Sequence, residues 1–214
     1  MVLVMGVFEI EVDPIRRLVQ PAFEAGEVVG RPFVRGVIGP NEVVVTYGFV
    51  GKVEAAMVAQ AFIDRFKPSS IVFTGAAGAL SRFLRIGDVI IGDEYFEFDL
   101  ARRDGKVELV EASERLIERI EEHVEGVFVG RIATGDSFIA DEAMREKVRR
   151  LTGAAAVDMD SAAIAKVAKE NGIEFVAMKT IVDDCTVESF RRNYERYAGK
   201  AAGILAGIID HHVL

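Results

Sequence analysis

Acidic side chains follow four of the five apolar runs that we expect to end at one edge of a sheet. They are Glu9 and Glu11 after residues 2–8, Asp136 after 127–134, Asp158 and Asp160 after 154–157, and Asp183 and Asp184 after 175–182. Ligands of open α/β sheets bind outside the carboxyl ends of the strands. There one carboxylate can accept two hydrogen bonds from vicinal sugar hydroxyls, a second can orient water, and a protonated third can donate to a leaving group. The pattern therefore favours chemistry on a ligand that contains a sugar.

The same acids have a simpler interpretation, because aspartate is a common N-cap of helices. Asp160 directly precedes an alanine-rich segment at 161–171, and the pair at 183–184 precedes another expected helix. The fifth run, at 70–74, ends in Gly75-Ala76-Ala77-Gly78, which suits either a ligand-binding loop or a tight exit from a strand. Spacing alone leaves both interpretations open.

Composition limits the class of protein. The chain has 214 residues, of which 50% are hydrophobic, so it can bury one sizeable core. The net charge is −8 and no run of Lys and Arg forms a basic stripe, which argues against a nucleic-acid partner. The single cysteine, Cys185, excludes an internal disulfide and suits a reducing cytosol. Without an 18-residue apolar span or a basic leader, we expect a soluble cytoplasmic protein that does not contact membranes.

Metal and phosphate-loop chemistry have no support in the sequence. The three histidines, His123, His211 and His212, lie far from Cys185, and none has the spacing of metal ligands. The motifs GxSxG, GxxxxGK[ST] and GxGxxG are absent. We therefore expect no metal and no cofactor.

The elements that position these acids follow from apolar periodicity. Helices alternate with unbroken apolar strands, which predicts a single α/β domain over residues 1–214, with a central mixed, mostly parallel sheet flanked by helices. The expected strands are 2–8, 34–38, 43–47, 70–74, 89–91, 127–134, 154–157 and 175–182. The expected helices are 14–19, 51–66, 113–124, 141–150, 161–171 and 188–212.

Six segments over nearly the whole chain carry a family resemblance. They read GVFEIEV, GKVEAAMVAQAFI, IVFTGAAGALSRFLRIGDVIIGDE, TGDSFIADEAM, VDMDSAAIAKVA and FVAMKTIVDD. In this order they resemble the nucleoside phosphorylase superfamily, and within it the 5′-methylthioadenosine/S-adenosylhomocysteine nucleosidases. The resemblance implies the fold of that superfamily, a purine nucleoside as the small-molecule substrate, and a place in methionine salvage.

The resemblance also implies roles for the acids. Glu11 stands where the family has the carboxylate that activates water, and Asp183 where it has the acid that protonates the purine N7. Asp160 stands where a glutamate usually binds the ribose 2′ and 3′ hydroxyls, and is one methylene shorter. Met159 matches the methionine that faces the ribose.

Five further residues are assigned to substrate binding by the same resemblance. Phe138 and Ile139 match residues that contact the purine, and Ala76 and Gly78 lie near the ribose and the attacking water. Lys179 stands where an arginine is common, so a planar fork is replaced by a point charge.

Water is the expected nucleophile. Phosphorylases hold a phosphate dianion with an arginine and a serine or threonine around such loops, whereas this chain has Phe73 and Ala76 there. Glu11 would also repel an anion. The resemblance thus implies hydrolysis of the N-glycosidic bond.

Several alternatives remain at this point. A phosphate-dependent purine nucleoside or methylthioadenosine phosphorylase, a hydrolase of futalosine-type nucleosides, and a binding protein without turnover are each compatible with the departures from the family pattern. Relatives assemble through a face near the sheet edge, so we expect a homodimer or larger homo-oligomer. An exposed apolar stripe on the helix at 51–66 could form the contact, and burial of that helix on its own sheet is the competing interpretation.

Overall fold

The computed structural model describes residues 1–100, 108–212 and 214. Its strands are β1 (Val2–Met5), β2 (Ala22–Val28), β3 (Arg31–Ile38), β4 (Asn41–Thr46), β5 (Ser70–Ala79), β6 (Val89–Glu97), β7 (Val110–Glu111), β8 (Phe128–Thr134), β9 (Ala156–Asp158) and β10 (Glu174–Asp183). Its helices are α1 (Asp13–Arg16), α2 (Lys52–Phe66), α3 (Glu114–Glu121), α4 (Glu142–Thr152), α5 (Ser161–Glu170), α6 (Val187–Tyr197) and α7 (Lys200–His211), with a short 3₁₀ helix, η1, at Glu9–Glu11.

The strands form one mixed sheet, which confirms the expected fold class. Parallel pairings join β4, β1, β5 and β10, so β1, β5 and β10 deliver their carboxyl ends to the same edge. Antiparallel pairings add β3 and β2 beyond β4. At the other side, β10, β6, β8, β9 and β5 pair in a closed circuit, because β9 returns to β5. The circuit brings the ends of β8 and β9 next to those of β5 and β10.

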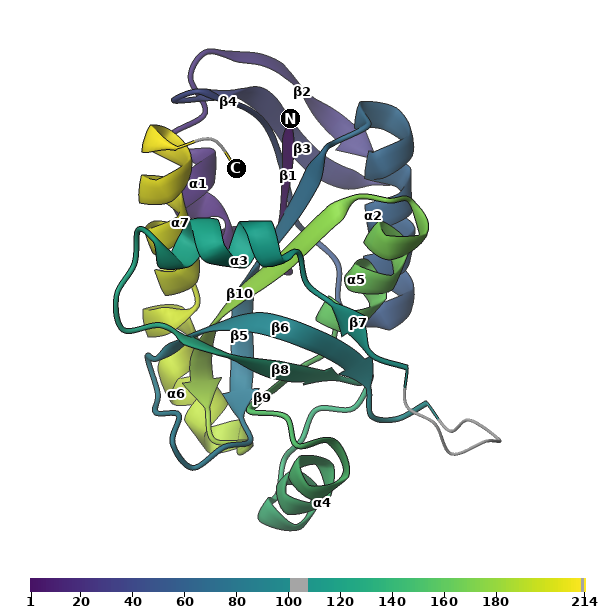
Figure 1. Ribbon diagram of the computed structural model, residues 1–214, viewed down its shortest axis with the longest axis vertical. Helices are drawn as coiled ribbons and strands as arrows, with labels where there is room; N and C mark the ends of the chain where they lie inside the picture. The colour runs from purple at the N-terminus through teal and green to yellow at the C-terminus, as the bar shows by residue number, and fades with distance from the viewer. Residues whose placement is uncertain (101–107, 213) are drawn as a thin grey trace.

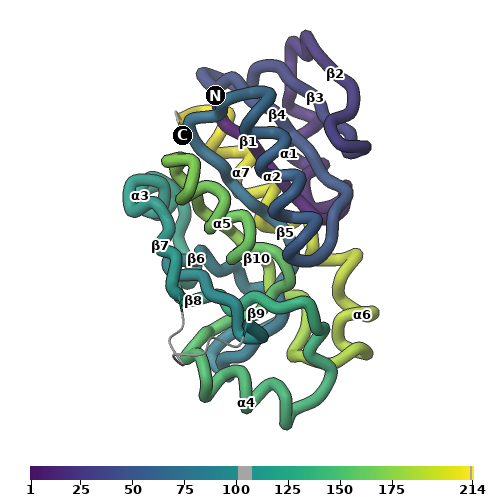
Figure 2. The backbone as a smooth tube through the Cα atoms, turned by 90° about the vertical axis from the view of Figure 1, so that its right-hand side faces the viewer, coloured from purple at the N-terminus to yellow at the C-terminus, as the bar shows by residue number. Residues whose placement is uncertain are grey.

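Helices cover both faces of the sheet. Figure 1 shows α2 and α5 along one side and α1 and α7 along the other. Alternate strand residues divide accordingly: Leu3 and Phe73 pack with α2 and α5, whereas Val4 and Val72 pack with α7. This alternation is why the strands read as unbroken apolar runs. In Figure 2, α4 lies at the end of the molecule opposite β2.

Local sequence signals define the ends of the helices that border the site. α2 begins after Gly51 and ends at Lys67, which has a left-handed backbone conformation just before Pro68. The side chain of Asp141 accepts a hydrogen bond from the Met144 amide and caps α4. Within the described ranges, no helix is both long enough and apolar enough to span a bilayer.

Three expectations about elements are wrong. Residues 75–78 do not form a loop but continue β5 as far as Ala79, because they pair with Lys179–Asp183 of β10. The single terminal helix expected at 188–212 is two helices, α6 and α7, which are separated at Ala198 and Gly199. The apolar pattern does not predict β2, since most of that edge strand is exposed.

Candidate active site

A cavity of about 230 Å³ opens at the edge of the sheet where β1, β5, β9 and β10 end. Its lining residues are Val7, Phe8, Glu11, Val50, Ala76, Ala77, Gly78, Ser137, Phe138, Ile139, Val157, Asp158, Met159, Asp160, Val182, Asp183, Cys185, Phe190 and Tyr194. The structure therefore brings together eight of the nine residues singled out in the sequence. The exception is Lys179.

Glu11 is 2% exposed and is held by four hydrogen bonds. The amides of Val7 and Phe8 donate to Oε2 at 2.8 and 3.2 Å. The amide of Ala76 and the hydroxyl of Tyr194 donate to Oε1 at 3.2 and 3.0 Å. Burial raises the pKa of Glu11, and the charge of Lys179 and the hydrogen bonds from Phe8, Val7 and Tyr194 oppose that rise. The result is a fixed carboxylate that is more basic than one in water.

The segment Asp158-Met159-Asp160 turns two acids in different directions. Asp158 accepts hydrogen bonds from Thr134 Oγ1 at 2.7 Å and from the amide of Ser161, so it caps α5. Asp160 makes no capping bond and accepts one from the amide of Gly51 at 2.6 Å. Met159, between them, lines the cavity. Asp160 thus occupies the N-cap position of α5 as expected, but the side chain that caps the helix is that of Asp158.

Asp160 carries a strongly perturbed acid group. Burial raises its pKa well above the ordinary value, and the nearby negative charge of Asp158 raises it further. The Gly51 amide and the ammonium group of Lys179 act in the opposite direction. A ligand that donates hydrogen bonds to this buried carboxylate stabilises its ionised form, because those bonds replace the hydration that the group lacks.

Lys179 lies one layer behind the cavity wall and is not among its described lining residues. Its ammonium nitrogen is 3.3 Å from Asp158 Oδ2 and 3.3 Å from the centroid of the Phe73 ring. The side chain is 1% exposed. The positive charge of Lys179 thus offsets the negative charge of the buried acids. A substrate contact was expected for Lys179, but the residue does not line the described cavity.

Asp183 ends β10 and is 4% exposed. Its Oδ1 accepts a hydrogen bond from the amide of Cys185 at 2.7 Å. Burial raises the pKa of Asp183 to about 6, and the negative charge of Asp184 contributes to the increase. This carboxyl group can hold a proton near neutral pH and donate it.

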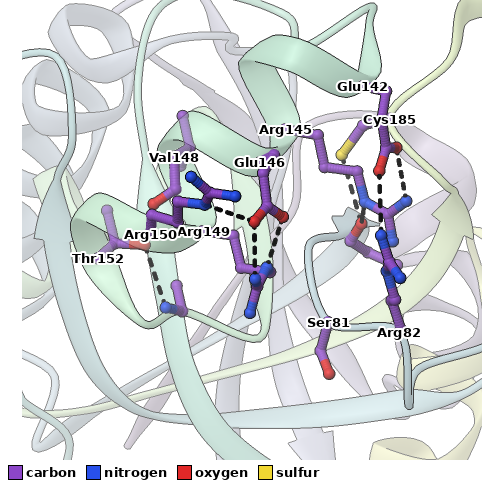
Figure 3. Close-up of polar contacts among 12 residues, drawn as sticks. Ser81, Arg82, Glu142, Arg145, Glu146, Val148, Arg149, Arg150, Thr152 and Cys185 are labelled. Carbon is purple, nitrogen blue, oxygen red and sulfur yellow. Dashed lines mark hydrogen bonds and ion pairs between the residues drawn. The ribbon is translucent and has the colours of Figure 1, made fainter.

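The backbone next to Asp183 is tied to α4. The Sγ of Cys185 and the Nε of Arg145 both donate to the carbonyl oxygen of Ala79, at 3.4 and 2.9 Å. Figure 3 shows both side chains directed at this oxygen. The contacts link the end of β5, the start of α4 and the turn that follows Asp183.

The two glycines of the segment 75–78 are required by the two buried acids. A Cβ on Gly75 would lie 2.8 Å from Glu11 Oε2, and the backbone there has φ +150°, which side-chain-bearing residues rarely adopt. A Cβ on Gly78 would lie 2.8 Å from Asp183 Oδ1. The glycines allow β5 to run directly beneath both carboxyl groups.

Aromatic side chains form the outer wall. Phe138 lies on Phe190 of α6 with ring centroids 5.5 Å apart, and Phe190 lies on Tyr194 at 4.9 Å. Ile139 is buried behind them. The sequence patterns above do not identify Phe190 and Tyr194, although two aromatics four residues apart on a largely polar helix are a usable signal.

No cationic side chain occurs among the described lining residues, which include four carboxyl groups. Nor do the described residues contain a group of three or more His, Cys, Asp and Glu side chains placed to hold a metal ion. The arrangement offers a base, an acid and a pair of hydroxyl acceptors around an apolar space.

Solved structures of nucleosidases share this fold, with TM-scores of 0.90. The sequence profile of the phosphorylase superfamily matches residues 2–210, and the chain belongs to that family.

Individual relatives narrow the comparison. The chain is 47% identical, over all of its length and 98% of the relative's, to the 5′-methylthioadenosine/S-adenosylhomocysteine nucleosidase of Thermotoga maritima. It is 31% identical to the Staphylococcus aureus (strain JH9) enzyme of the same name, with 94% of each chain covered.

Solved structures from Helicobacter pylori are also similar. A nucleosidase of this name, in complex with a substituted pyrrolidinol, matches with a TM-score of 0.90 and 25% identity, covering 98% of this chain and 97% of the other. A futalosine hydrolase matches with a TM-score of 0.91 and 26% identity, over the same shares of the two chains.

Proposed function

We propose that this protein hydrolyses the N-glycosidic bond of a 5′-substituted purine nucleoside of the 5′-methylthioadenosine or S-adenosylhomocysteine type and releases the free base. The activity named for the T. maritima and S. aureus relatives supports this proposal. The observation that carries it is the charge of the cavity, which has four carboxyl groups and no cation among its described lining residues.

That charge decides between water and phosphate. A bound phosphate dianion needs several charge-assisted hydrogen bonds, each worth about 1.5–3 kcal/mol. The described cavity wall supplies acids in their place, which repel an anion. Water needs only a carboxylate that orients it, and Glu11 meets that need.

The proposed reaction begins with stretching of the bond between the ribose and the purine. Positive charge grows on the sugar as an oxocarbenium ion, and the surrounding carboxylates stabilise it. Asp160 accepts hydrogen bonds from the two ribose hydroxyls, and Met159 packs against the sugar. Phe138 and Ile139 hold the purine, while Ala76 and Gly78 leave room for the ribose and the water.

Two acids then perform opposed tasks. Asp183, with its pKa raised to about 6, donates a proton to N7 of the departing purine. Glu11 accepts a proton from the attacking water. Its pKa is also raised by burial, which makes it a stronger base so long as the pH keeps it ionised.

A futalosine-type nucleoside is the second candidate substrate. The futalosine hydrolase of H. pylori has essentially the same backbone over 98% of this chain. Hydrolysis of an N-glycosidic bond in such a nucleoside would use the same acid and base of this chain, so the residues described here fit either substrate. An assay must discriminate between them.

The experiment is an assay of free base released from purified protein, with and without phosphate. Its panel comprises 5′-methylthioadenosine, S-adenosylhomocysteine, 5′-deoxyadenosine, futalosine and inosine. We expect phosphate-independent release of adenine from the first two nucleosides. An absolute need for phosphate would overturn the proposal in favour of a phosphorylase, and faster release of hypoxanthine from futalosine would replace the substrate.

Two variants test the mechanism. Glu11→Gln and Asp183→Asn keep the side-chain shapes and should each lower kcat by at least about 100-fold. Circular dichroism checks that both variants fold. Ligand-induced thermal stabilisation without turnover in the unmodified protein would instead identify a binding protein.

We also propose that the chain works as a single domain in a homodimer or larger homo-oligomer. α2 buries Val58 and Phe62 against the sheet, yet it leaves Val53 79% and Met57 45% exposed on its outer face. Val50, at the cavity wall, is 44% exposed and lies just before this helix.

We further propose a cytoplasmic location and a role in methionine salvage. The buried Cys185, which forms no disulfide, suits that reducing compartment.

A further inference from the structure

Tyr194 makes a contact that the reaction described above does not use. Its hydroxyl donates to Glu11 Oε1 at 3.0 Å. The other donors to this carboxylate are backbone amides, those of Val7, Phe8 and Ala76. Among the described residues, the only side chain that donates a hydrogen bond to Glu11 therefore comes from α6.

The sheet itself supplies no equivalent side chain. Ala76 has no hydroxyl and contributes only its amide. The ammonium group of Lys179 is engaged by Asp158 and by the Phe73 ring. Among the described residues, Tyr194 of α6 is therefore the one side chain that donates to Glu11 Oε1, beside the Ala76 amide of β5.

α6 borders the cavity through partly buried side chains, among them Phe190 and Tyr194. None of its residues is buried. Tyr194 is anchored by ring contacts, edge-on to Phe8 with centroids 6.0 Å apart and beside Phe190 at 4.9 Å. Phe8 and Phe190 both line the cavity. A ligand that packs on these rings therefore also fixes the position of the Tyr194 hydroxyl.

We propose that Tyr194 is a positioning residue for Glu11. When the substrate packs against α6, Tyr194 fixes the carboxylate that activates the attacking water. The inference rests on the proposed function, in which Glu11 is the base. The hydroxyl holds the carboxylate in one orientation and stabilises its ionised form, which is the form that accepts a proton.

The electrostatics agree with a donor role for the tyrosine. Burial and the adjacent carboxylate raise the pKa of Tyr194, so its hydroxyl keeps its proton throughout any practical assay range. Its hydrogen bond lowers the pKa of Glu11 against the effect of burial. Two charged groups also act on Glu11, Lys179 from β10 and Asp160 from the start of α5. Both stay in place when the hydroxyl alone is removed.

The test is Tyr194→Phe, which keeps the ring and its contacts with Phe8 and Phe190. Loss of a hydrogen bond to a charged group should lower kcat about tenfold or more, while KM changes less than about twofold. The acid limb of the pH profile of kcat/KM should move to higher pH, because Glu11 loses a donor that favours its ionised form. A purely structural role would change KM and the thermal unfolding temperature and leave the acid limb in place.

Tyr197→Phe is the matched control. Tyr197 lies on the same helix but does not line the cavity, and its ring lies under the guanidinium of Arg196 at 5.1 Å. This variant should keep wild-type kcat, KM and pH profile.

Glu11→Gln separates the inference from the proposed function. In the Glu11→Gln background, Tyr194→Phe should cost little more, since the two residues act as a unit. Wild-type kinetics in Tyr194→Phe beside an inactive Glu11→Gln would overturn the inference alone. An equal loss from Tyr194→Phe in both backgrounds would do the same. Full activity in Glu11→Gln would overturn the proposed base and the inference together.

Discussion

At the scale of single residues, the site separates two buried acids by their surroundings. Glu11 is surrounded by four donors that hold a negative charge in place. Asp183 has one donor among the described residues, the amide of Cys185, and has the acid Asp184 beside it. Hydrogen bonds to a carboxylate favour its ionised form. Glu11, which accepts more of them, is therefore suited to act as the base, and Asp183 to act as the acid.

Asp183 should reduce stability at alkaline pH. An acid whose pKa rises from its ordinary value of 3.8 to about 6 on folding favours the folded state when protonated. That stability is fully present below about pH 4 and is lost as the pH rises through about 6. Asp183→Asn should therefore be more stable than the wild type at pH 8, by up to about 3 kcal/mol, and similar to it at pH 4. Denaturant unfolding at the two pH values measures the difference.

Asp64→Asn provides the control for this prediction, since the side chain of Asp64 is 65% exposed on α2. It should change stability by less than about 0.5 kcal/mol at either pH. If Asp183→Asn were less stable than the wild type at pH 8, burial of the ionised Asp183 carboxylate would not be destabilising, which would contradict this prediction.

Residue type and position along the chain predict which acids gather at the cavity, but not which way each side chain points. Asp158 and Asp160 both border the cavity, and spacing alone does not predict that Asp158 caps α5 while Asp160 accepts a hydrogen bond from the Gly51 amide. Lys179 shares a strand face with Ala177 and Ile181, which pack toward α2 and α5. The position of Lys179 behind the cavity depends on how β10 pairs with β5, and apolar spacing does not specify that pairing.

At the scale of elements, β5 is the support of the site. It runs directly beneath the two buried acids, with Gly75 under Glu11 and Gly78 under Asp183. A motif that looks like a loop in the sequence is a strand here because β10 pairs with it through these residues. Pairing between distant segments is the information that a single sequence lacks, which is also why the exposed strand β2 has no apolar signal.

Gly78→Ala tests this support. The new Cβ would lie 2.8 Å from Asp183 Oδ1 and 3.3 Å from Cys185 Sγ, so the carboxyl group must move. Because misplacement of a catalytic group by an ångström is costly, we expect kcat to fall by about 100-fold with the fold retained. Steady-state kinetics and thermal unfolding measure the two effects.

Gly130→Ala is the matched control on β8 of the same sheet. Its Cβ would lie 3.6 Å from the nearest atom, Ala155 Cβ, which is an ordinary contact. Activity should stay within about twofold of the wild type, since nothing near Gly130 touches the cavity. Equal losses in both variants would show that any added methyl group in the sheet is harmful and that Gly78 has no special place.

At the scale of the whole molecule, the sequence predicts the fold class because both faces of the sheet are covered and the strands are therefore uniformly apolar. It does not decide whether the outer face of α2 is covered. The structure shows a helix with two roles: one side is buried in the core, and the other exposes Val53 and Met57 one turn apart. Exposed apolar side chains at this spacing form a continuous stripe, which suits a contact with a second copy of the chain.

Val53→Glu should therefore disrupt assembly. Sedimentation velocity of the wild type at micromolar concentration should show a dimer or larger oligomer, and the variant should sediment as a monomer because an unpaired carboxylate cannot be buried at the contact. Leu151→Glu is the control, since Leu151 is 59% exposed on α4. That variant should keep the wild-type oligomer. A monomeric wild type would exclude the oligomer. A Val53→Glu variant that still forms the same oligomer would show that the contact lies elsewhere than on the outer face of α2, the face on which this prediction depends.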